Sequence, residues 1–289
     1  MQTERRIEKR WFPENIPQEL KDLPIWIGFR FIPQEDKKPK KMPLHAVTGK
    51  EAKSNDPGTW SIFDALVAGD KVRNFDANGI GLQAPYVGID LDHSVIDGII
   101  QPWAREIIEA FDSYTEFSPT GTGVHILCKG ELSQGRKFVT LDIEIYQTVR
   151  FFTVTGDLVT GSNKSIEERP ELVSRFFDIW EKKNEANKFR RSVIKKAEKS
   201  KDGADFAKLR AGNWQADYPS QSEADLSFCG KLAFWTGKDA ALMDALFRES
   251  GLMRPKWDEK HFADGRTYGQ EVINKAIGGC QDVYAGNQV

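Results

Sequence analysis

The sequence has few cysteines and no long apolar run. Cys128, Cys229 and Cys280 are far apart and form no CxxC pair, so neither a disulfide framework nor a cysteine zinc site is expected. No apolar run approaches the roughly 20 residues that span a bilayer, and the first ten residues, MQTERRIEKR, carry charge where a signal peptide would be apolar. We therefore expect a cytoplasmic protein without zinc and without a membrane partner.

A strong excess of charge of either sign is also missing. The 41 Lys and Arg residues nearly balance 43 Asp and Glu residues, which gives a formal net charge of −2. The whole chain therefore lacks the electrostatic signature of a basic nucleic-acid-binding protein. Basic residues gather only locally, in residues 30–53 and 182–210. Such stretches form either a solvated face or a nucleic-acid contact, and composition does not choose between the two.

The first 182 residues combine strand-like and helix-like segments in no regular order. WIGFRF, YVGIDLD and VHILC have the β-branched and aromatic content of strands. Apolar residues recur at helical spacing in residues 102–111 and again in residues 168–183. Because strands and helices do not alternate, we predict an α+β fold rather than a doubly wound one.

The composition changes between residues 183 and 204, where Lys, Arg, Glu and Asn replace most apolar residues. This stretch suits an exposed charged helix or a linker. Beyond it, three segments have apolar residues at three- and four-residue spacing and end on glycine, as helices with left-handed caps do. The predicted parts are a catalytic domain (1–182), a charged linker or helix (183–204) and a small helical bundle (205–289).

Two aspartates in VGIDLDH form the first candidate site. Asp90 and Asp92 are two positions apart on a predicted strand, so both side chains leave the same face. Paired carboxylates suit Mg²⁺, and two such ions can activate a hydroxyl while neutralising a leaving phosphate. Acidic pairs also occur by chance at exposed strand ends. The apolar neighbours Val87, Ile89 and Leu91 favour a site, because they would hold the charge near a core.

A second acidic pair, Asp142 and Glu144 in LDIEIY, repeats this spacing on another predicted strand. Glu144 would complete a three-carboxylate site. An ordinary amphipathic strand with both acids in water explains the segment equally well. The segment alone therefore leaves the two interpretations open.

The segment SPTGTGVHI lies between the two acidic pairs and has the features of a phosphate-binding turn. Its glycines let the backbone approach a ligand closely, and its hydroxyls can bond phosphate oxygens. A hydroxyl-rich turn followed by a structural histidine would give the same pattern. The candidate triphosphate ligands are Ser118, Thr120, Gly121, Gly123 and His125.

Together, IDLDH, SPTGTGVHI and IEIYQTVRFFTVTG resemble, in this order and spacing, the archaeo-eukaryotic primase superfamily, most closely its phage- and plasmid-type primase-polymerases. The resemblance implies an RRM-like mixed sheet with flanking helices, followed by a small C-terminal helical bundle. It also implies that two Mg²⁺ or Mn²⁺ ions are bound by carboxylates. The implied catalytic residues are Asp90, Asp92, Glu144 and His125, of which the three acids bind metal.

The activity implied by the resemblance is template-dependent nucleotidyl transfer. Such a DNA polymerase and primase joins dNTPs or NTPs to a primer or an initiating nucleotide on single-stranded DNA, in phage or plasmid replication inside a bacterial or archaeal host. A replicative helicase, as a further domain or a separate protein, is a possible partner. Arg150, Lys53 and Lys41 would add positive charge near the triphosphate. Phe151 departs from the tyrosine that relatives place after this arginine, but its ring can still act as a steric gate against a ribose 2′-hydroxyl.

Two other functions use the same features. A two-metal nuclease or phosphohydrolase would activate water with the same carboxylates, although the phosphate-binding turn argues against it. A non-catalytic origin-binding or helicase-loading protein would keep the fold, although the intact acids and histidine argue against it. Three C-terminal tryptophans are either stacking platforms for bases or, as is more common, core residues. They are Trp214, Trp235 and Trp257.

Overall fold

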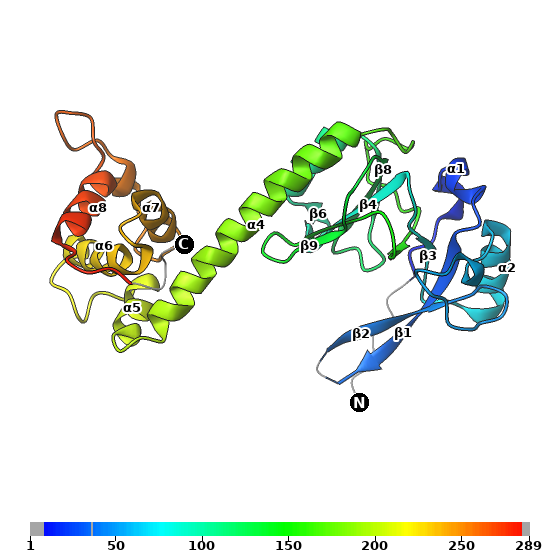
Figure 1. Ribbon diagram of the computed structural model, residues 1–289, viewed down its shortest axis with the longest axis horizontal. Helices are drawn as coiled ribbons and strands as arrows, with labels where there is room; N and C mark the ends of the chain where they lie inside the picture. The colour runs from blue at the N-terminus through cyan, green and yellow to red at the C-terminus, as the bar shows by residue number, and fades with distance from the viewer. Residues whose placement is uncertain (1–8, 36, 285–289) are drawn as a thin grey trace. The chain divides into compact units, whose positions relative to one another are not determined.

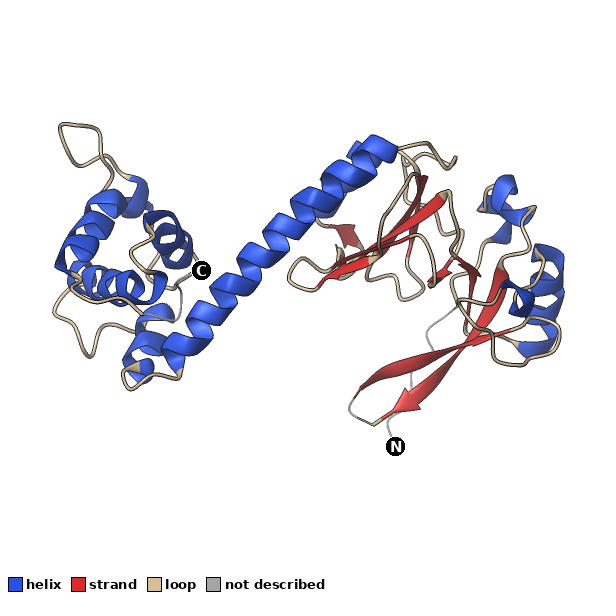
Figure 2. Cartoon of the chain, in the orientation of Figure 1, coloured by secondary structure: helices blue, strands red, loops and turns tan. Residues whose placement is uncertain are grey.

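The computed structural model describes residues 9–35 and 37–284 (Figure 1). The chain divides into two units, Met1–Asn184 and Glu185–Val289, called here the first unit and the second unit. Antiparallel sheets and helices build the first unit, whereas the second unit contains helices (Figure 2). The predicted α+β class is confirmed.

The first unit contains two larger antiparallel sheets. The four-stranded sheet has the order β11-β3-β1-β2, and the five-stranded sheet has the order β7-β8-β4-β10-β9. A small ribbon, β5 (Val95–Ile96) with β6 (Ile99–Ile100), follows β4. The strands of the four-stranded sheet are β1 (Trp26–Gln34), β2 (Lys37–Leu44), β3 (Ala77–Gly81) and β11 (Phe151–Thr153). Those of the five-stranded sheet are β4 (Tyr86–Leu91), β7 (Tyr114–Phe117), β8 (Val124–Lys129), β9 (Arg136–Phe138) and β10 (Ile143–Tyr146).

Helices flank these sheets and begin where the sequence supplies start signals. Helix α3 (Pro102–Phe111) has proline in its first turn, where the missing N–H costs nothing, and ends at Asp112, which adopts a left-handed conformation (φ 38°). Helix α4 (Pro170–Glu198) also starts at a proline, and it continues through most of the charged stretch 183–204. The remaining helical elements before α4 are η1 (Pro13–Asn15), α1 (Gln18–Lys21), η2 (Pro57–Thr59) and α2 (Phe63–Arg73).

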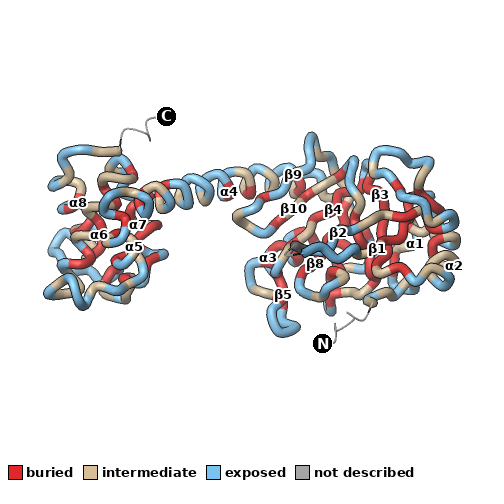
Figure 3. The backbone as a smooth tube through the Cα atoms, turned by 90° about the horizontal axis from the view of Figure 1, so that it is seen from below, coloured by how far each residue is buried: buried red, intermediate tan, exposed pale blue. Residues whose placement is uncertain are grey.

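Two separate cores cover the two faces of the five-stranded sheet. On one face, Ile89 and other odd-numbered residues of β4 pack with Phe111 of α3 and Trp180 of α4. On the other face, Tyr86 joins Phe152 of the four-stranded sheet in a second core. Figure 3 shows buried residues concentrated on strands such as β1 and β3. Because side chains alternate along a strand, β4 contributes to both cores and its even-numbered residues face the four-stranded sheet.

The second unit packs its helices around a third core. Side-chain caps start three of its helices, including a capping box in which Thr267 and Gln270 bond each other's backbone N–H. Gly237 ends α6 in the left-handed region (φ 67°). No helix in the described residues is long and apolar enough to cross a membrane. The elements after α4 are α5 (Gly203–Arg210), α6 (Gln221–Thr236), α7 (Ala240–Arg248), η3 (Pro255–Asp258) and α8 (Tyr268–Gly279).

The structure places one candidate stacking tryptophan in this core. Trp257 is 1% exposed and stacks on Phe247 with ring centroids 3.5 Å apart. Its Nε1 donates to Oδ1 of Asp244 over 2.8 Å, so the polar edge of the ring is also satisfied. Trp214 and Trp235 pack against the same core with part of their surface exposed. Trp257 is therefore a core residue rather than a platform for bases.

We expect Trp257→Ala to lower the free energy of unfolding of the second unit by about 3–5 kcal/mol, because it removes a large buried ring and leaves a cavity. Leu226→Ala is the matched control, since Leu226 is 41% exposed on α6 and its loss should cost less than about 0.5 kcal/mol. Chemical denaturation followed by circular dichroism measures both. A Trp257→Ala effect as small as the control's would contradict the assigned core role.

Candidate active site

One row of directly paired residues crosses all five strands of the five-stranded sheet. Glu116 pairs with His125, His125 with Asp90, Asp90 with Glu144, and Glu144 with Lys137. Directly paired side chains leave the same face with Cβ atoms roughly 4.5–5.5 Å apart. This set, called here the charged row, therefore gathers three carboxylates, one imidazole and one ammonium on the face toward the four-stranded sheet.

Alternation along β4 explains why Asp90 reaches this face. Val87, Ile89 and Leu91 are fully buried among the helices, so Asp90 leaves the opposite side. Asp92 follows the last residue of β4, and its N–H donates to the carbonyl of Asp142 over 2.8 Å. The structure thus places both predicted aspartates at the end of β4, at the charged row.

Asp90 and His125 share the buried part of the row. Nε2 of His125 lies 3.7 Å from Oδ1 of Asp90. Burial, together with the charges of Asp92 and Glu144, raises the pKa of Asp90, although His125 opposes this effect. Burial alone would lower the pKa of His125, but Asp90 and Glu116 outweigh it and the net pKa is raised. The two groups therefore stabilise each other's charge in a setting that penalises either charge alone.

Glu144 has two direct partners, Lys137 and Tyr146, that the sequence interpretation missed. The ammonium of Lys137 contacts Oε1 of Glu144, which is the leading cause of the raised pKa of Lys137. The hydroxyl of Tyr146 donates to Oε2 of Glu144 over 3.1 Å, and the guanidinium of Arg150 lies 4.8 Å from the centre of the Tyr146 ring. Tyr146 could have been found from its spacing, because it follows Glu144 by two positions on β10. Lys137 has no such local signal.

Hydroxyls and glycines shape the 118–123 turn against the end of β4. The N–H of Gly123 donates to Oγ of Ser118 over 3.1 Å, and the Thr120 hydroxyl lies 3.2 Å from that same oxygen. A Cβ on Gly123 would lie 2.9 Å from the carbonyl oxygen of Leu91, so only glycine lets the turn approach β4 this closely. Gly121 has a φ of 71°, in the left-handed region that residues with a side chain rarely adopt. The predicted turn therefore lies beside the aspartates, with its hydroxyls bonded within the turn.

The predicted cations Lys41 and Lys53 lie on β2 and in the loop before η2. Lys41 is near enough to Asp90 and His125 to lower the pKa of both groups, although other charges and burial contribute more. Lys53 lies in the loop before η2, where its backbone carbonyl accepts from Nε1 of Trp60 over 2.9 Å. Trp60 in turn meets the ring of Phe151, with centroids 6.3 Å apart.

Phe151 is held by aromatic rings on the four-stranded sheet. Its ring meets Phe29 and Trp60 edge to face, with centroids 6.1 and 6.3 Å away. The next residue, Phe152, points to the other side of β11 and contacts the ring of His125, 4.6 Å between centroids. The strand therefore carries one ring toward the charged row and one into the four-stranded sheet's own aromatic cluster.

Asp90, Asp92 and Glu144 provide carboxylate oxygens as metal ligands but do not form a closed metal cage. Within residues 9–35 and 37–284, no three His, Cys, Asp or Glu side chains are gathered as a metal-ion site. The ammonium of Lys137 contacts Glu144 and lies 4.0 Å from Oδ2 of Asp92, so a cationic group already bridges two of the acids. Hard divalent ions take carboxylate oxygens of this kind. The donor set therefore fits Mg²⁺ or Mn²⁺ once Lys137 is displaced.

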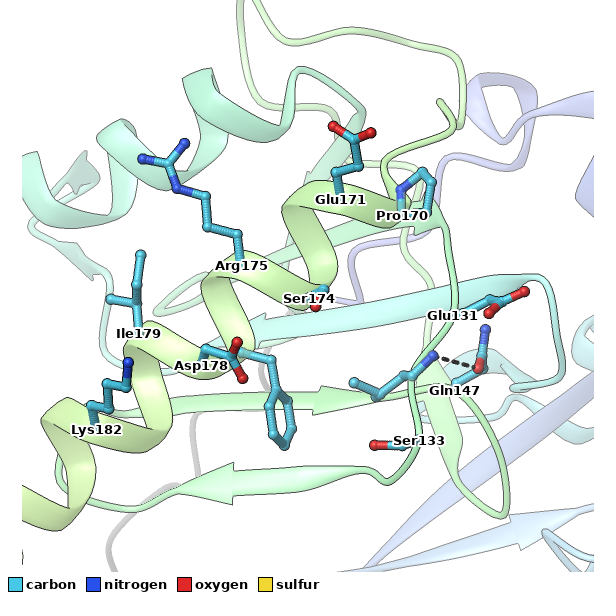
Figure 4. Close-up of a pocket in the computed structure, with 12 residues that line it drawn as sticks. Glu131, Ser133, Gln147, Pro170, Glu171, Ser174, Arg175, Asp178, Ile179 and Lys182 are labelled. Carbon is cyan, nitrogen blue, oxygen red and sulfur yellow. Dashed lines mark hydrogen bonds between the residues drawn. The ribbon is translucent and has the colours of Figure 1, made fainter.

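A pocket elsewhere in the first unit contains none of the predicted site residues. It lies between the start of α4 and the 131–133 segment, where the N–H of Leu132 donates to Oε1 of Gln147 over 3.0 Å (Figure 4). The pocket is lined by two basic residues of α4, Arg175 and Lys182, and by three acidic residues, Glu131, Glu171 and Asp178. This mixture of charges points to no single ligand, and the charged row remains the candidate site.

Comparison with known proteins finds a similar phage protein and a matching family model. The chain is similar to the DNA primase-polymerase of Nitratiruptor phage NrS-1, with 35% identity over 261 residues, or 84% of this chain and 35% of that protein. The predicted resemblance to phage primase-polymerases is confirmed. A family model described as the NrS-1 polymerase HBD domain also matches residues 221–286, in the second unit. The chain spans about a third of the length of this phage relative.

We expect Asp90→Asn to raise the melting temperature at pH 7. The raised pKa of Asp90 means that the folded state favours the neutral form, so an ionised Asp90 destabilises it. As the pH falls through the folded-state pKa, wild-type Asp90 is protonated and the difference between the two proteins should shrink. Asp142→Asn is the control, since the Asp142 side chain is 55% exposed and asparagine tolerates its φ of 56°. A lower melting temperature for Asp90→Asn at pH 7 would mean that the attraction between ionised Asp90 and His125 outweighs the cost of burying the charge of Asp90.

Proposed function

We propose that this chain is a template-dependent DNA primase-polymerase. It would transfer nucleotidyl groups from dNTPs or NTPs to a primer or an initiating nucleotide on single-stranded DNA, in phage or plasmid replication. The observation that carries the proposal is the pairing of Asp90 with both His125 and Glu144, with the 118–123 turn beside them. The similarity to a DNA primase-polymerase supports the same activity.

The finer features of the fold belong to the same proposal. The five-stranded antiparallel sheet, with α3 and α4 on one face, serves as the RRM-like catalytic core. Helices α5–α8 serve as the C-terminal helical bundle, which the match of residues 221–286 supports. The single-stranded template and the primer are the nucleic-acid partners, and a replicative helicase remains a further predicted partner.

Asp90, Asp92 and Glu144 are the proposed metal ligands. Two bound Mg²⁺ or Mn²⁺ ions would supply activation of the attacking hydroxyl and neutralisation of the leaving phosphates. Lys137 contacts Glu144 and lies near Asp92, which limits repulsion among the acids, and a bound metal ion would take over this role. Asp90, held by His125, keeps its oxygens at the same end of β4 as Asp92.

The remaining residues bind and align the nucleotide. Nε2 of His125 faces the carboxylates, so a protonated ring can donate to a phosphate oxygen next to them. Arg150, steadied on the Tyr146 ring, and Lys41 add positive charge for the triphosphate. Phe151, fixed by its aromatic neighbours, is the proposed steric gate at the sugar, and Lys53 is a further proposed source of positive charge. Ser118, Thr120 and the backbone at Gly121 and Gly123 would line the phosphates, exchanging bonds within the turn for bonds to the ligand.

We expect Glu144→Gln and Asp92→Ala to reduce nucleotide incorporation by at least on the order of 100-fold, because each loses a charged ligand at the reacting phosphate. Asp142→Asn is the matched control from the second acidic pair and should retain activity. The assay extends a labelled primer on single-stranded DNA with dNTPs and Mg²⁺ or Mn²⁺. If Asp142→Asn is inactive and Glu144→Gln is active, the wrong acid has been assigned. Metal-dependent shortening of the primer, without extension, would instead indicate a nuclease.

We expect His125→Ala to raise the KM for dNTP by about 10-fold while leaving the Kd for primed template nearly unchanged. The reason is that the ring is buried and its Nε2 faces the carboxylate of Asp90 rather than an open nucleic-acid surface. His93→Ala is the control, because the His93 side chain is 63% exposed and lies beside Asp142. Steady-state kinetics and fluorescence anisotropy give the two constants. Equal losses of both affinities would show that His125 is structural.

A further inference from the structure

Glu116 lies at one end of the charged row and takes no part in the chemistry proposed above. It is 1% exposed, and both of its carboxylate oxygens accept hydrogen bonds. The N–H of Thr155 donates to Oε1 over 2.9 Å, and the N–H of Gly156 donates to Oε2 over 2.8 Å. The hydroxyl of Tyr114 also donates to Oε2, over 2.7 Å. Glu116 therefore fixes the backbone that follows β11.

The same carboxylate faces His125. Oε1 of Glu116 lies 3.6 Å from Nδ1 of His125, and the carbonyl oxygen of Thr153 lies 3.0 Å from that nitrogen. A backbone carbonyl can only accept, so Nδ1 carries a proton and Nε2 is the nitrogen turned toward Asp90. Phe152 packs on the ring from β11. The ring is thus held by Thr153 and Phe152, and Glu116 fixes the chain directly after them.

Anchoring the backbone of Thr155 and Gly156 does not by itself require an acid at position 116. Two neutral acceptors, such as backbone carbonyls, can satisfy two backbone N–H groups at a lower cost of burial than a carboxylate. What distinguishes Glu116 from a neutral acceptor is its in-register pairing with His125, with a negative group on the Nδ1 side of the ring. Carboxylates that orient a histidine through its second nitrogen are a general device for fixing the other nitrogen.

We propose that Glu116 is a positioning residue for His125. It holds the ring with Nδ1–H toward Thr153 and Nε2 toward Asp90, directly through its carboxylate and indirectly through the Thr155–Gly156 backbone. The effect on nucleotide binding rests on the proposed function of His125 as a triphosphate ligand. The orientation of the ring does not, so it can be measured without substrate.

The kinetic test compares Glu116→Gln with Tyr114→Phe in the full chain. Tyr114→Phe removes one hydrogen bond from the same carboxylate but keeps its charge and its bonds to the N–H groups of Thr155 and Gly156, so it controls for the loss of the Tyr114 bond. Glu116→Gln should raise the KM for dNTP by about 10-fold, with a smaller change in kcat and an unchanged Kd for primed template. Tyr114→Phe should stay within about two-fold of the wild type in all three, and Glu116→Asp should recover part of the loss.

The structural test records ring ¹⁵N shifts of the histidines at one pH without substrate, with His125→Ala used to assign the signals. The His125 signals should move in Glu116→Gln and stay in place in Tyr114→Phe. Unmoved His125 signals in a folded Glu116→Gln protein would overturn the proposal, as would equal kinetic losses in the two variants. Should Glu116→Gln fail to fold, Glu116→Asp decides: displaced ring signals support the positioning role, and unmoved ones refute it. If the His125 signals move in Glu116→Gln as expected but the wild-type protein incorporates no nucleotide, the proposed function alone is refuted and the positioning role stands.

Discussion

The candidate site depends on the pairing register of β4. Its even-numbered residues face the four-stranded sheet, while Val87, Ile89 and Leu91 are buried under α3 and α4. A one-residue slip against β8 or β10 would turn a whole strand over and carry His125 or Glu144 to the helix-covered face. Such a slip would also expose apolar side chains on the wrong side. Burial of the apolar core therefore also fixes which polar groups meet.

Charge alternates along the row except at one place. His125 separates Glu116 from Asp90, and Lys137 follows Glu144 at the far edge. Between them, Asp90 and Glu144 are direct neighbours with like charge, and each like-charged neighbour of Asp90 raises its pKa. A divalent cation would relieve most repulsion there. The row thus offsets its own charges at both ends and leaves an excess of negative charge at its centre.

The sequence could predict the parts of this site that have a local pattern. The α+β class followed from irregular strands and helices, and Asp90 stood out among apolar neighbours on one strand. Glu116 and Lys137 could not be predicted, because they reach the row only through pairing of β7 with β8 and of β9 with β10. The chain also passes from one sheet to the other between β3 and β4 and again between β10 and β11. Turn residues indicate where a strand ends but not which sheet the next strand joins.

Strand β11 connects two sides of the proposed nucleotide site in three residues. Phe151 packs against Phe29 and Trp60, while Phe152 lies on His125 and on Gly88, where a Cβ would come within 2.9 Å of its ring. A substitution at Phe151 that shifts the strand must therefore also move the ring resting on His125. If Phe151 selects the sugar and His125 holds the phosphates, the two preferences are mechanically coupled. Evolution could not easily change the kind of nucleotide accepted without also changing how tightly it is held.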